Sequence, residues 1–253
     1  FDRVHFSYSP DATAPALVDV TLDVAAGSSV ALVGPSGSGK STVLALLAGL
    51  YAPTRGRILI DGQDISQFSS TSLRDSLAVI PQSPTIFSAS ANYNILYGRL
   101  SATPTQVRAA AAVASADEFI ERLKAGYDEP LGERGSLLSG GQIQRISLAR
   151  ALLKDAPIFL MDEATSALDA RTERSVQLAI EEASRGKTKV IVAHRLSSIL
   201  SADLIVYMEN GSLVAQGRHV RLMNECRQYA ELIKLSFPAQ SAAEHPSTES
   251  PPF

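Results

Sequence analysis

The stretch Gly34-Pro35-Ser36-Gly37-Ser38-Gly39-Lys40-Ser41 decides how this 253-residue chain is expected to fold. Residues 30–33 before it are apolar and partly β-branched, which predicts a buried strand, and residues 42–47 after it predict a helix. Glycines let a backbone curve closely around an anion, and the N-terminus of the next helix points N–H groups at it. The stretch therefore predicts a phosphate-binding loop between a strand and a helix.

The spacing Gly-x-x-x-x-Gly-Lys-Ser is that of a P-loop, which binds the phosphates of a nucleotide. In this interpretation Lys40 reaches the β- and γ-phosphates, and the Ser41 hydroxyl is a ligand of Mg²⁺. The alternative is a flexible glycine turn without a ligand. The predicted strand and helix on either side argue against that alternative.

Composition and charge narrow the classes of protein to which the chain can belong. Its length suits one large or two small domains, and the net charge of −3 gives no electrostatic reason to expect a nucleic-acid partner. A single cysteine, Cys226, excludes an internal disulfide. The longest apolar runs, such as residues 43–52, fall short of the ~18 residues of a membrane span, so we expect a soluble piece. Because it begins without Met inside a predicted strand, we expect a segment of a longer chain.

Hydrophobic patterning divides the chain into a strand-rich start, a helical middle and an alternating end. Short apolar or alternating runs predict strands at residues 3–8, 17–24, 30–33, 57–60 and 77–80, with a hairpin turn at Asp61-Gly62. Residues 84–153 are rich in alanine and poor in β-branched residues, so we expect a helical insert there, with helices over 106–115, 117–124 and 143–153.

The last third of the chain alternates strands with helices. We expect strands at residues 158–161, 189–193 and 204–207, a crossover helix at 171–184, a hairpin turn at Asn210-Gly211 and a helix at 229–235. Such alternation predicts an α/β fold with a parallel, doubly wound sheet. Residues 238–253 are too polar to pack and are expected to form a disordered tail.

Polar side chains lie just past the ends of three of the predicted parallel strands. Asp162 and Glu163 come directly after the predicted strand at 158–161. Beside a P-loop, Asp162 would hold Mg²⁺, and Glu163 would orient or deprotonate the water that attacks the γ-phosphate. Gln82 and His194 follow two other strands, and ligands bind at this edge of open α/β sheets. We expect His194 to contact the γ-phosphate and Gln82 to bind the metal or the water. A solvated strand end or an ordinary surface side chain is the alternative for each residue taken alone.

A second glycine loop, Leu138-Ser139-Gly140-Gly141-Gln142, precedes the predicted helix at 143–153. Ser139 is a suitable N-cap, and the loop is another anion-binding helix N-terminus. Ser-Gly-Gly is also an ordinary way to begin a helix, which is the alternative. One nucleotide needs only one P-loop, so a head-to-tail dimer, in which each second loop covers the other chain's nucleotide, would use both.

Together these motifs closely resemble the nucleotide-binding domain of ATP-binding cassette (ABC) transporters, over about residues 1–237. The family's motifs occur in its order: P-loop at 34–41, Q-loop at Gln82, signature loop at 138–142, Walker B with Glu163, D-loop at 166–169 and switch His194. The resemblance implies a P-loop NTPase (RecA-like) core with a parallel sheet, an N-terminal antiparallel β subdomain and an inserted α-helical subdomain. The implied boundaries are residues 1–83 and 154–237 for the core and 84–153 for the helical subdomain.

The resemblance also implies a site for ATP and Mg²⁺. Its catalytic residues would be Glu163, His194, Lys40 and Gln82, and its metal ligands Ser41, Gln82 and Asp162. The nucleotide would contact Gly34, Pro35, Ser36, Gly37, Ser38, Gly39, Lys40, Ser41, Thr42, Gln82 and Asp162, and Tyr8 would stack on adenine. Ser139, Gly140, Gly141 and Gln142 would bind the partner's nucleotide, and Asp169 would lie at the dimer interface. For Tyr8 the alternative is an ordinary aromatic residue of a sheet.

Two further stretches, Glu133-Arg134-Gly135 and residues 83–88, resemble the exporter type, in which this domain follows a membrane domain in one polypeptide. That implies a second cassette, identical or not, and transmembrane domains as partners, and a location at the membrane on the ATP-containing side. An importer subunit and a soluble, non-transport ABC ATPase remain the alternatives. Asn92-Tyr93-Asn94 departs from the exporters' Arg-Glu-Asn, and residues 218–221 replace a usually acidic patch, so coupling to the membrane domain can differ here.

Overall fold

A six-stranded sheet forms the centre of the fold in the computed structural model, which describes residues 1–9, 14–162 and 170–237. Its parallel strands are mostly buried, apolar and rich in β-branched residues, as expected of strands covered on both faces. Five strands run parallel, and β11 pairs antiparallel with β10. The order across the sheet is β11 (Ser212–Gly217), β10 (Leu204–Glu209), β3 (Ser29–Val33), β9 (Thr188–Val192), β8 (Ile158–Asp162), β7 (Leu77–Ile80).

Helices cover both faces of this sheet, because alternate side chains of each strand point to opposite faces. On one face Leu32 and Leu160 pack in the same apolar cluster as Val43 and Leu46 of α1 (Lys40–Leu47). On the other face, Phe159 packs with the helices α6 (Gly140–Lys154) and α7 (Ala170–Ala183). Helices α8 (Leu196–Leu200), α9 (His219–Glu225) and α10 (Arg227–Ser236) cover the β10 end of that face.

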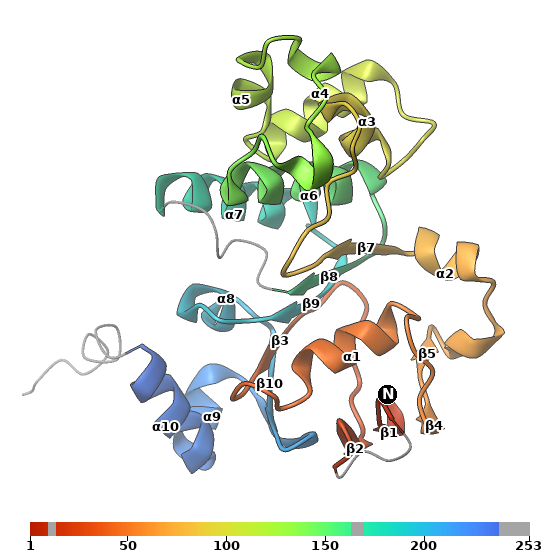
Figure 1. Ribbon diagram of the computed structural model, residues 1–253. Helices are drawn as coiled ribbons and strands as arrows, with labels where there is room; N and C mark the ends of the chain where they lie inside the picture. Colours follow the sequence, from red (N-terminus) through yellow and green to blue (C-terminus); the bar gives the residue numbers. More distant parts are fainter. Residues whose placement is uncertain (10–13, 163–169, 238–253) are drawn as a thin grey trace, which may run out of the picture.

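The N-terminal strands form a separate antiparallel sheet beside α1 (Figure 1). Its order is β2 (Leu17–Val20), β1 (Asp2–Phe6), β4 (Arg55–Arg57). A short hairpin of β5 (Leu59–Ile60) and β6 (Gln63–Asp64) follows it, and α2 (Ser70–Asp75) leads to β7. The sequence predicted one strand at 57–60. The structure instead has two, β4 and β5, which are separated by the buried Ile58.

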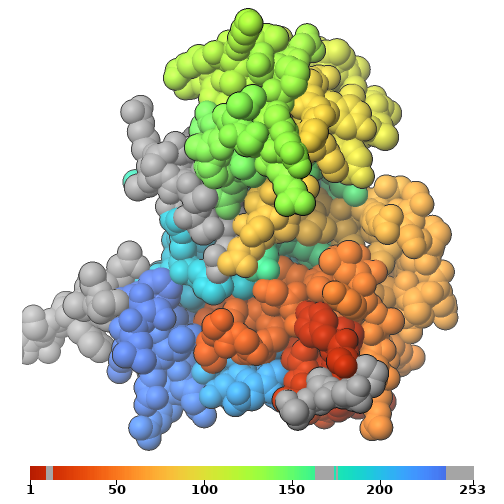
Figure 2. All heavy atoms as spheres, viewed as in Figure 1, coloured from red at the N-terminus to blue at the C-terminus, as the bar shows by residue number. Residues whose placement is uncertain are grey.

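A helical lobe stands above the sheet, at the top of Figures 1 and 2. It consists of α3 (Ala91–Leu96), α4 (Pro104–Val113), α5 (Asp117–Glu121), two 3₁₀ turns, Gly126–Asp128 and Glu133–Gly135, and α6. Its small residues, among them Ala110, Ala111 and Ala149, let the helices pack closely. The start of α4 is fixed by a capping box between Thr103 and Gln106, with Pro104 in its first turn.

The fold class predicted from the sequence is therefore confirmed: a parallel core sheet, an N-terminal antiparallel β part and an inserted group of helices. Both hairpin turns occur as predicted, since Asp61-Gly62 joins β5 to β6 and Asn210-Gly211 joins β10 to β11. Four short helices, α2, α3, α8 and α9, were not predicted, and the helix expected at 117–124 ends at Glu121. The domain boundaries stay predictions, and the tail at 238–253 lies outside the described residues.

Within the described ranges, none of the helices combines the length and the apolar character that crossing a membrane requires.

Candidate functional site

A groove of about 320 Å³ lies at the carboxyl edge of the central sheet. Residues far apart in the sequence meet there because β3, β7, β8 and β9 are parallel and end at the same edge. Its lining residues are Tyr8, Ala16, Ser36, Gly37, Ser38, Gly39, Lys40, Ser41, Thr42, Gln82, Asp162 and His194. The structure thus brings together most of the residues that the sequence analysis selected separately.

The loop between β3 and α1 has the backbone shape of an anion cradle. Gly39, the N-cap of α1, has a φ of 98°, and a Cβ there would lie 2.8 Å from the backbone oxygen of Ala16. Gly37 has a φ of 77°, and a Cβ there would meet nothing within 4 Å. Both positive φ values favour glycine, and at Gly39 the neighbouring backbone also leaves no room for a side chain.

Lys40 places a positive charge inside this loop. Its ammonium donates hydrogen bonds to the backbone oxygens of Gly34, at 2.9 Å, and Pro35, at 2.8 Å, and to Ser38 Oγ at 3.3 Å. The residue is only 5% exposed. The first turn of α1 adds N–H groups without intrahelical acceptors, and no side chain caps them. Both features suit a phosphate group, which has negative charge and accepts several hydrogen bonds.

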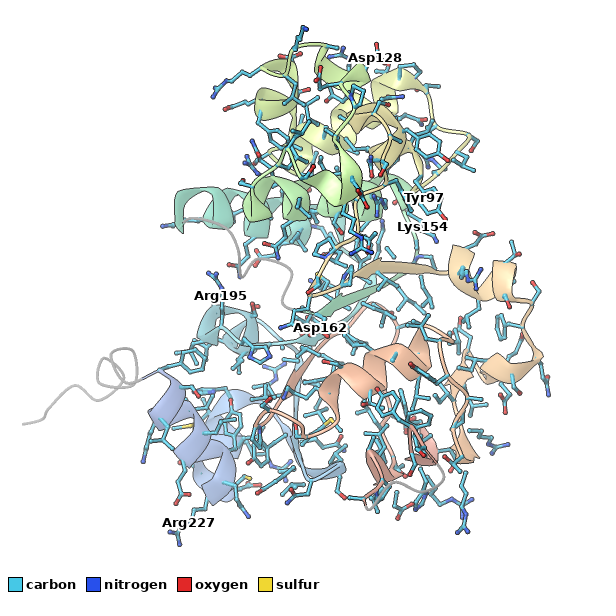
Figure 3. The ribbon with its side chains drawn as sticks, in the orientation of Figure 1. Tyr97, Asp128, Lys154, Asp162, Arg195 and Arg227 are labelled. Carbon is cyan, nitrogen blue, oxygen red and sulfur yellow. The ribbon has the colours of Figure 1, made fainter. Side chains whose placement is uncertain are left out.

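Oxygen ligands for a hard cation lie next to the cradle. Ser41, Gln82 and Asp162, whose side chains carry a hydroxyl, an amide and a carboxylate, all line the groove. Figure 3 shows Asp162 where β8 ends, near the middle of the molecule. Hydroxyl, amide and carboxylate oxygens, completed by phosphate oxygens, are the ligands that Mg²⁺ prefers, so these residues fit the ion.

Tyr8 lies at the rim of the groove. Its hydroxyl is 3.1 Å from Thr42 Oγ1, and the residue is 57% exposed. Its ring makes edge contacts with Phe6, at a centroid distance of 4.9 Å, and with Tyr51, at 5.2 Å. These contacts hold the ring beside the loop and leave it open to a planar ligand.

The second glycine loop does not reach this groove. Ser139 is the N-cap of α6, as predicted: its side chain accepts from the Gln142 N–H at 3.3 Å, and the Gln142 side chain accepts from the Ser139 N–H at 2.8 Å. Ser139 and Gly140 are exposed and absent from the groove lining. Within one chain, the two predicted phosphate-binding elements are therefore separate.

Some of the expected site residues do not line the groove or lie outside the described residues. The backbone oxygens of Gly34 and Pro35 accept hydrogen bonds from Lys40, but neither residue lines the groove. Glu163 and the D-loop with Asp169 lie outside the described residues. The sequence analysis missed Ala16 in the lining and Tyr51 against Tyr8, because only the folded antiparallel sheet brings these residues to the loop.

A larger surface groove of about 600 Å³ lies on the antiparallel sheet. Arg3 and Arg57 in its lining both pair with Asp2, and their side chains are 78% and 60% exposed. Mixed charges on exposed side chains do not form a preorganised site. We therefore assign the chemistry to the smaller groove at the sheet edge.

Comparison with known proteins gives consistent matches. A family model described as "ABC transporter" matches residues 17–166. The chain is 49% identical over 238 residues to an ATP-dependent lipid A-core flippase of Hahella chejuensis, covering 94% of this chain and 40% of that protein. It is 47% identical over 232 residues to an ATM1-type heavy metal exporter of Novosphingobium aromaticivorans, covering 92% of this chain and 38% of that protein.

Among solved structures, a bacterial Atm1-family ABC exporter with ATP bound matches with a TM-score of 0.87 and 44% sequence identity. The match covers 98% of this chain and 42% of that one. The chain thus spans about two fifths of the length of the relatives that it matches.

Proposed function

This chain belongs to the ABC transporter family, and from that premise we propose that it is the ATP-hydrolysing domain of an exporter. The observation that carries the proposal is the groove at the sheet edge, where the P-loop, Gln82, Asp162 and His194 meet. A nucleotide triphosphate with Mg²⁺ matches the positive charge, the N–H donors and the oxygen ligands gathered there.

In this proposal each groove residue has one role. Lys40 and the first turn of α1 hold the phosphates, while Ser41, Gln82 and Asp162 hold Mg²⁺, which would neutralise charge on the phosphate oxygens. His194 contacts the γ-phosphate. Glu163, directly after Asp162 in the sequence, accepts the proton of the attacking water. Catalysis then consists mainly of positioning and of stabilising charge that develops on phosphate oxygens.

A second copy of the cassette, identical or not, would complete the site. The Ser139 loop is exposed, begins a 15-residue helix and lies outside its own chain's groove, so it is free to bind the γ-phosphate held by a partner. A head-to-tail arrangement uses both loops of both chains. Hydrolysis removes the γ-phosphate that the second loop binds, and so favours opening.

We further propose that opening drives export through transmembrane domains of the same transporter, at the side of the membrane that contains ATP. The two relatives named above, a lipid A-core flippase and a heavy metal exporter, support export over import. Measurement of phosphate release from ATP, with Mg²⁺ and with a chelator, tests the enzymatic part. We expect Mg²⁺-dependent release that rises more than linearly with protein concentration; no release at any concentration would refute it.

Replacing Tyr8 by alanine is expected to raise the Kd for ATP roughly tenfold, because stacking on a base contributes about 1–3 kcal/mol. Tyr8 is expected to provide this stacking because its ring is exposed at the rim of the groove. Titration with a fluorescent ATP analogue measures the effect.

Tyr8→Phe is the matched control. It keeps the ring and removes only the hydroxyl near Thr42 Oγ1, so we expect a Kd within about twofold of the parent chain. Equal Kd values for Tyr8→Ala and the parent would show that Tyr8 does not contact the base.

A further inference from the structure

Arg150 connects the signature helix α6 to two segments far away in the sequence. Its guanidinium donates from Nε to the Asn94 backbone oxygen at 2.8 Å and from Nη1 to the Thr85 backbone oxygen at 3.1 Å. Its Nη2 donates to Asn94 Oδ1 at 3.1 Å. Thr85 belongs to the segment that follows Gln82, and Asn94 belongs to α3. One side chain of α6 therefore holds both.

Asn94 extends this connection along the segment after Gln82. It is fully buried, and its Oδ1 also accepts from the Phe87 N–H at 2.8 Å. Its Nδ2 donates to the backbone oxygens of Phe87, at 3.1 Å, and Ser90, at 3.0 Å. The amide thus holds the backbone of residues 87–90 in one conformation and presents its oxygen to Arg150.

Two aromatic rings lie near the guanidinium of Arg150, and Gly98 lies close to the backbone of the same residue. Arg150 Cζ lies 5.0 Å from the ring centroid of Phe87 and 5.9 Å from that of Tyr97, which Figure 3 labels at the base of the helical lobe. A Cβ at Gly98 would lie 2.1 Å from the backbone oxygen of Arg150, so only glycine lets α3 end against α6 this closely. The segment, α3 and α6 therefore form one tightly packed unit.

A second contact joins the same segment to the other side of the signature loop. A Cβ at Gly135, just before that loop, would lie 3.1 Å from Ile86 Cβ, and Ile86 is 2% exposed. Residues 85–87 therefore touch the chain both before and after residues 138–142.

A half-buried positive charge is an unusual choice for this position if packing were its only role. In the described part of the chain no carboxylate pairs with Arg150, and burial lowers the pKa of its guanidinium. An aliphatic residue would fill the space without this desolvation. What only the guanidinium supplies is a rigid set of donors that spans Asn94 and Thr85 at once.

We propose that Arg150 is a positioning residue that makes the Gln82 loop and the Ser139 signature loop of one chain move as a unit. When Gln82 engages the metal and nucleotide in its own groove, the segment after it carries that displacement through Thr85 and Asn94 to Arg150 and α6. The signature loop at the start of α6 then takes the position in which it binds the partner's nucleotide. The inference rests on the proposed function and adds an internal connection to it.

A double-mutant cycle between Arg150→Met and Gln82→Ala on ATP turnover tests this connection. Methionine keeps the unbranched stem that packs on Phe87 and removes the donors. We expect each single variant to lower kcat about tenfold, and the double variant to lower kcat by about the same tenfold. For Arg150→Met, the KM for ATP should stay within about twofold of the parent. Residues that act through the same step are not additive.

Arg108→Met is the matched control, since Arg108 is also in the helical lobe, but its guanidinium pairs with Glu121 and lies 4.4 Å from the Tyr127 ring centroid. We expect its kcat to stay within about twofold of the parent. When it is combined with Gln82→Ala, the fold-reduction in kcat should equal the product of the two single reductions. Thermal melting checks folding, and Arg150→Lys repeats the cycle if Arg150→Met melts well below the parent, because lysine keeps the charge without the fork.

The inference would be overturned if the double variant of Arg150 and Gln82 had a kcat about a hundredfold below that of the parent, because that is the product of the two single effects. An Arg150 variant with unchanged kcat would also overturn it. Absence of turnover in the parent chain would reject the proposed function and with it the inference. Turnover in the parent together with a multiplicative cycle would reject the inference alone.

Discussion

Lys40→Ala is expected to lower ATP turnover by roughly 10²–10³-fold, the loss typical of removing one preorganised charge donor from a reacting group. Lys40 is the cation inside the curve of the P-loop, and its ammonium is held by the backbone oxygens of Gly34 and Pro35. Without it, the γ-phosphate would face loop oxygens with no opposing charge. Steady-state phosphate release measures turnover, and titration with labelled ATP measures binding, which we expect to weaken as well.

Lys234→Ala is the control for this variant. Lys234 is an exposed lysine on α10, outside the groove, so its replacement is expected to leave turnover within about twofold of the parent. If Lys40→Ala keeps both the turnover and the affinity of the parent, the P-loop does not bind the nucleotide as proposed.

Glu163→Gln is expected to separate binding from chemistry. The structure ends β8 at Asp162, which lines the groove, and Glu163 is the next residue in the sequence. An amide of the same shape cannot accept a proton, so turnover should fall about 10²-fold or more. The affinity for ATP should stay within about threefold, because the phosphate and metal ligands are intact.

Glu118→Gln makes the same isosteric change at an exposed position on α5, where the carboxylate pairs with Arg122 on the surface. It should leave both turnover and affinity unchanged, since exposed pairs contribute about 0–1 kcal/mol. Retention of half or more of the parent's turnover by Glu163→Gln would exclude Glu163 as the main base.

Local chemistry made much of this fold predictable. Asp61-Gly62 and Asn210-Gly211 place both turn residues at positive φ, between 48° and 79°, the conformation that joins two antiparallel strands tightly. The P-loop likewise needs only eight consecutive residues. The carboxyl ends of parallel strands share one edge, so Gln82, Asp162 and His194 could be assigned to one site before their positions were known.

Features that depend on contacts distant in sequence were not predictable. Helix α3 has six residues, two of them asparagines, which have low helix propensity, and it is stabilised by the burial of Asn94 and by Arg150, 56 residues away. The contact of Tyr51 with Tyr8 and the split of the strand at Ile58 likewise depend on packing of the antiparallel sheet. Periodicity carries no information about such pairs.

The central claim, in the form in which the partner cassette is a second copy of this chain, is that ATP joins the two copies through the P-loop of one and the signature loop of the other. Sizing chromatography of Glu163→Gln, with and without ATP and Mg²⁺, tests it most directly, with Glu163→Gln/Gly141→Arg as the control in which the signature loop is blocked. We expect the size of two chains only with ATP, and of one chain for the control under both conditions. A single chain with ATP bound at saturation, or a dimer that the control also forms, would contradict the claim.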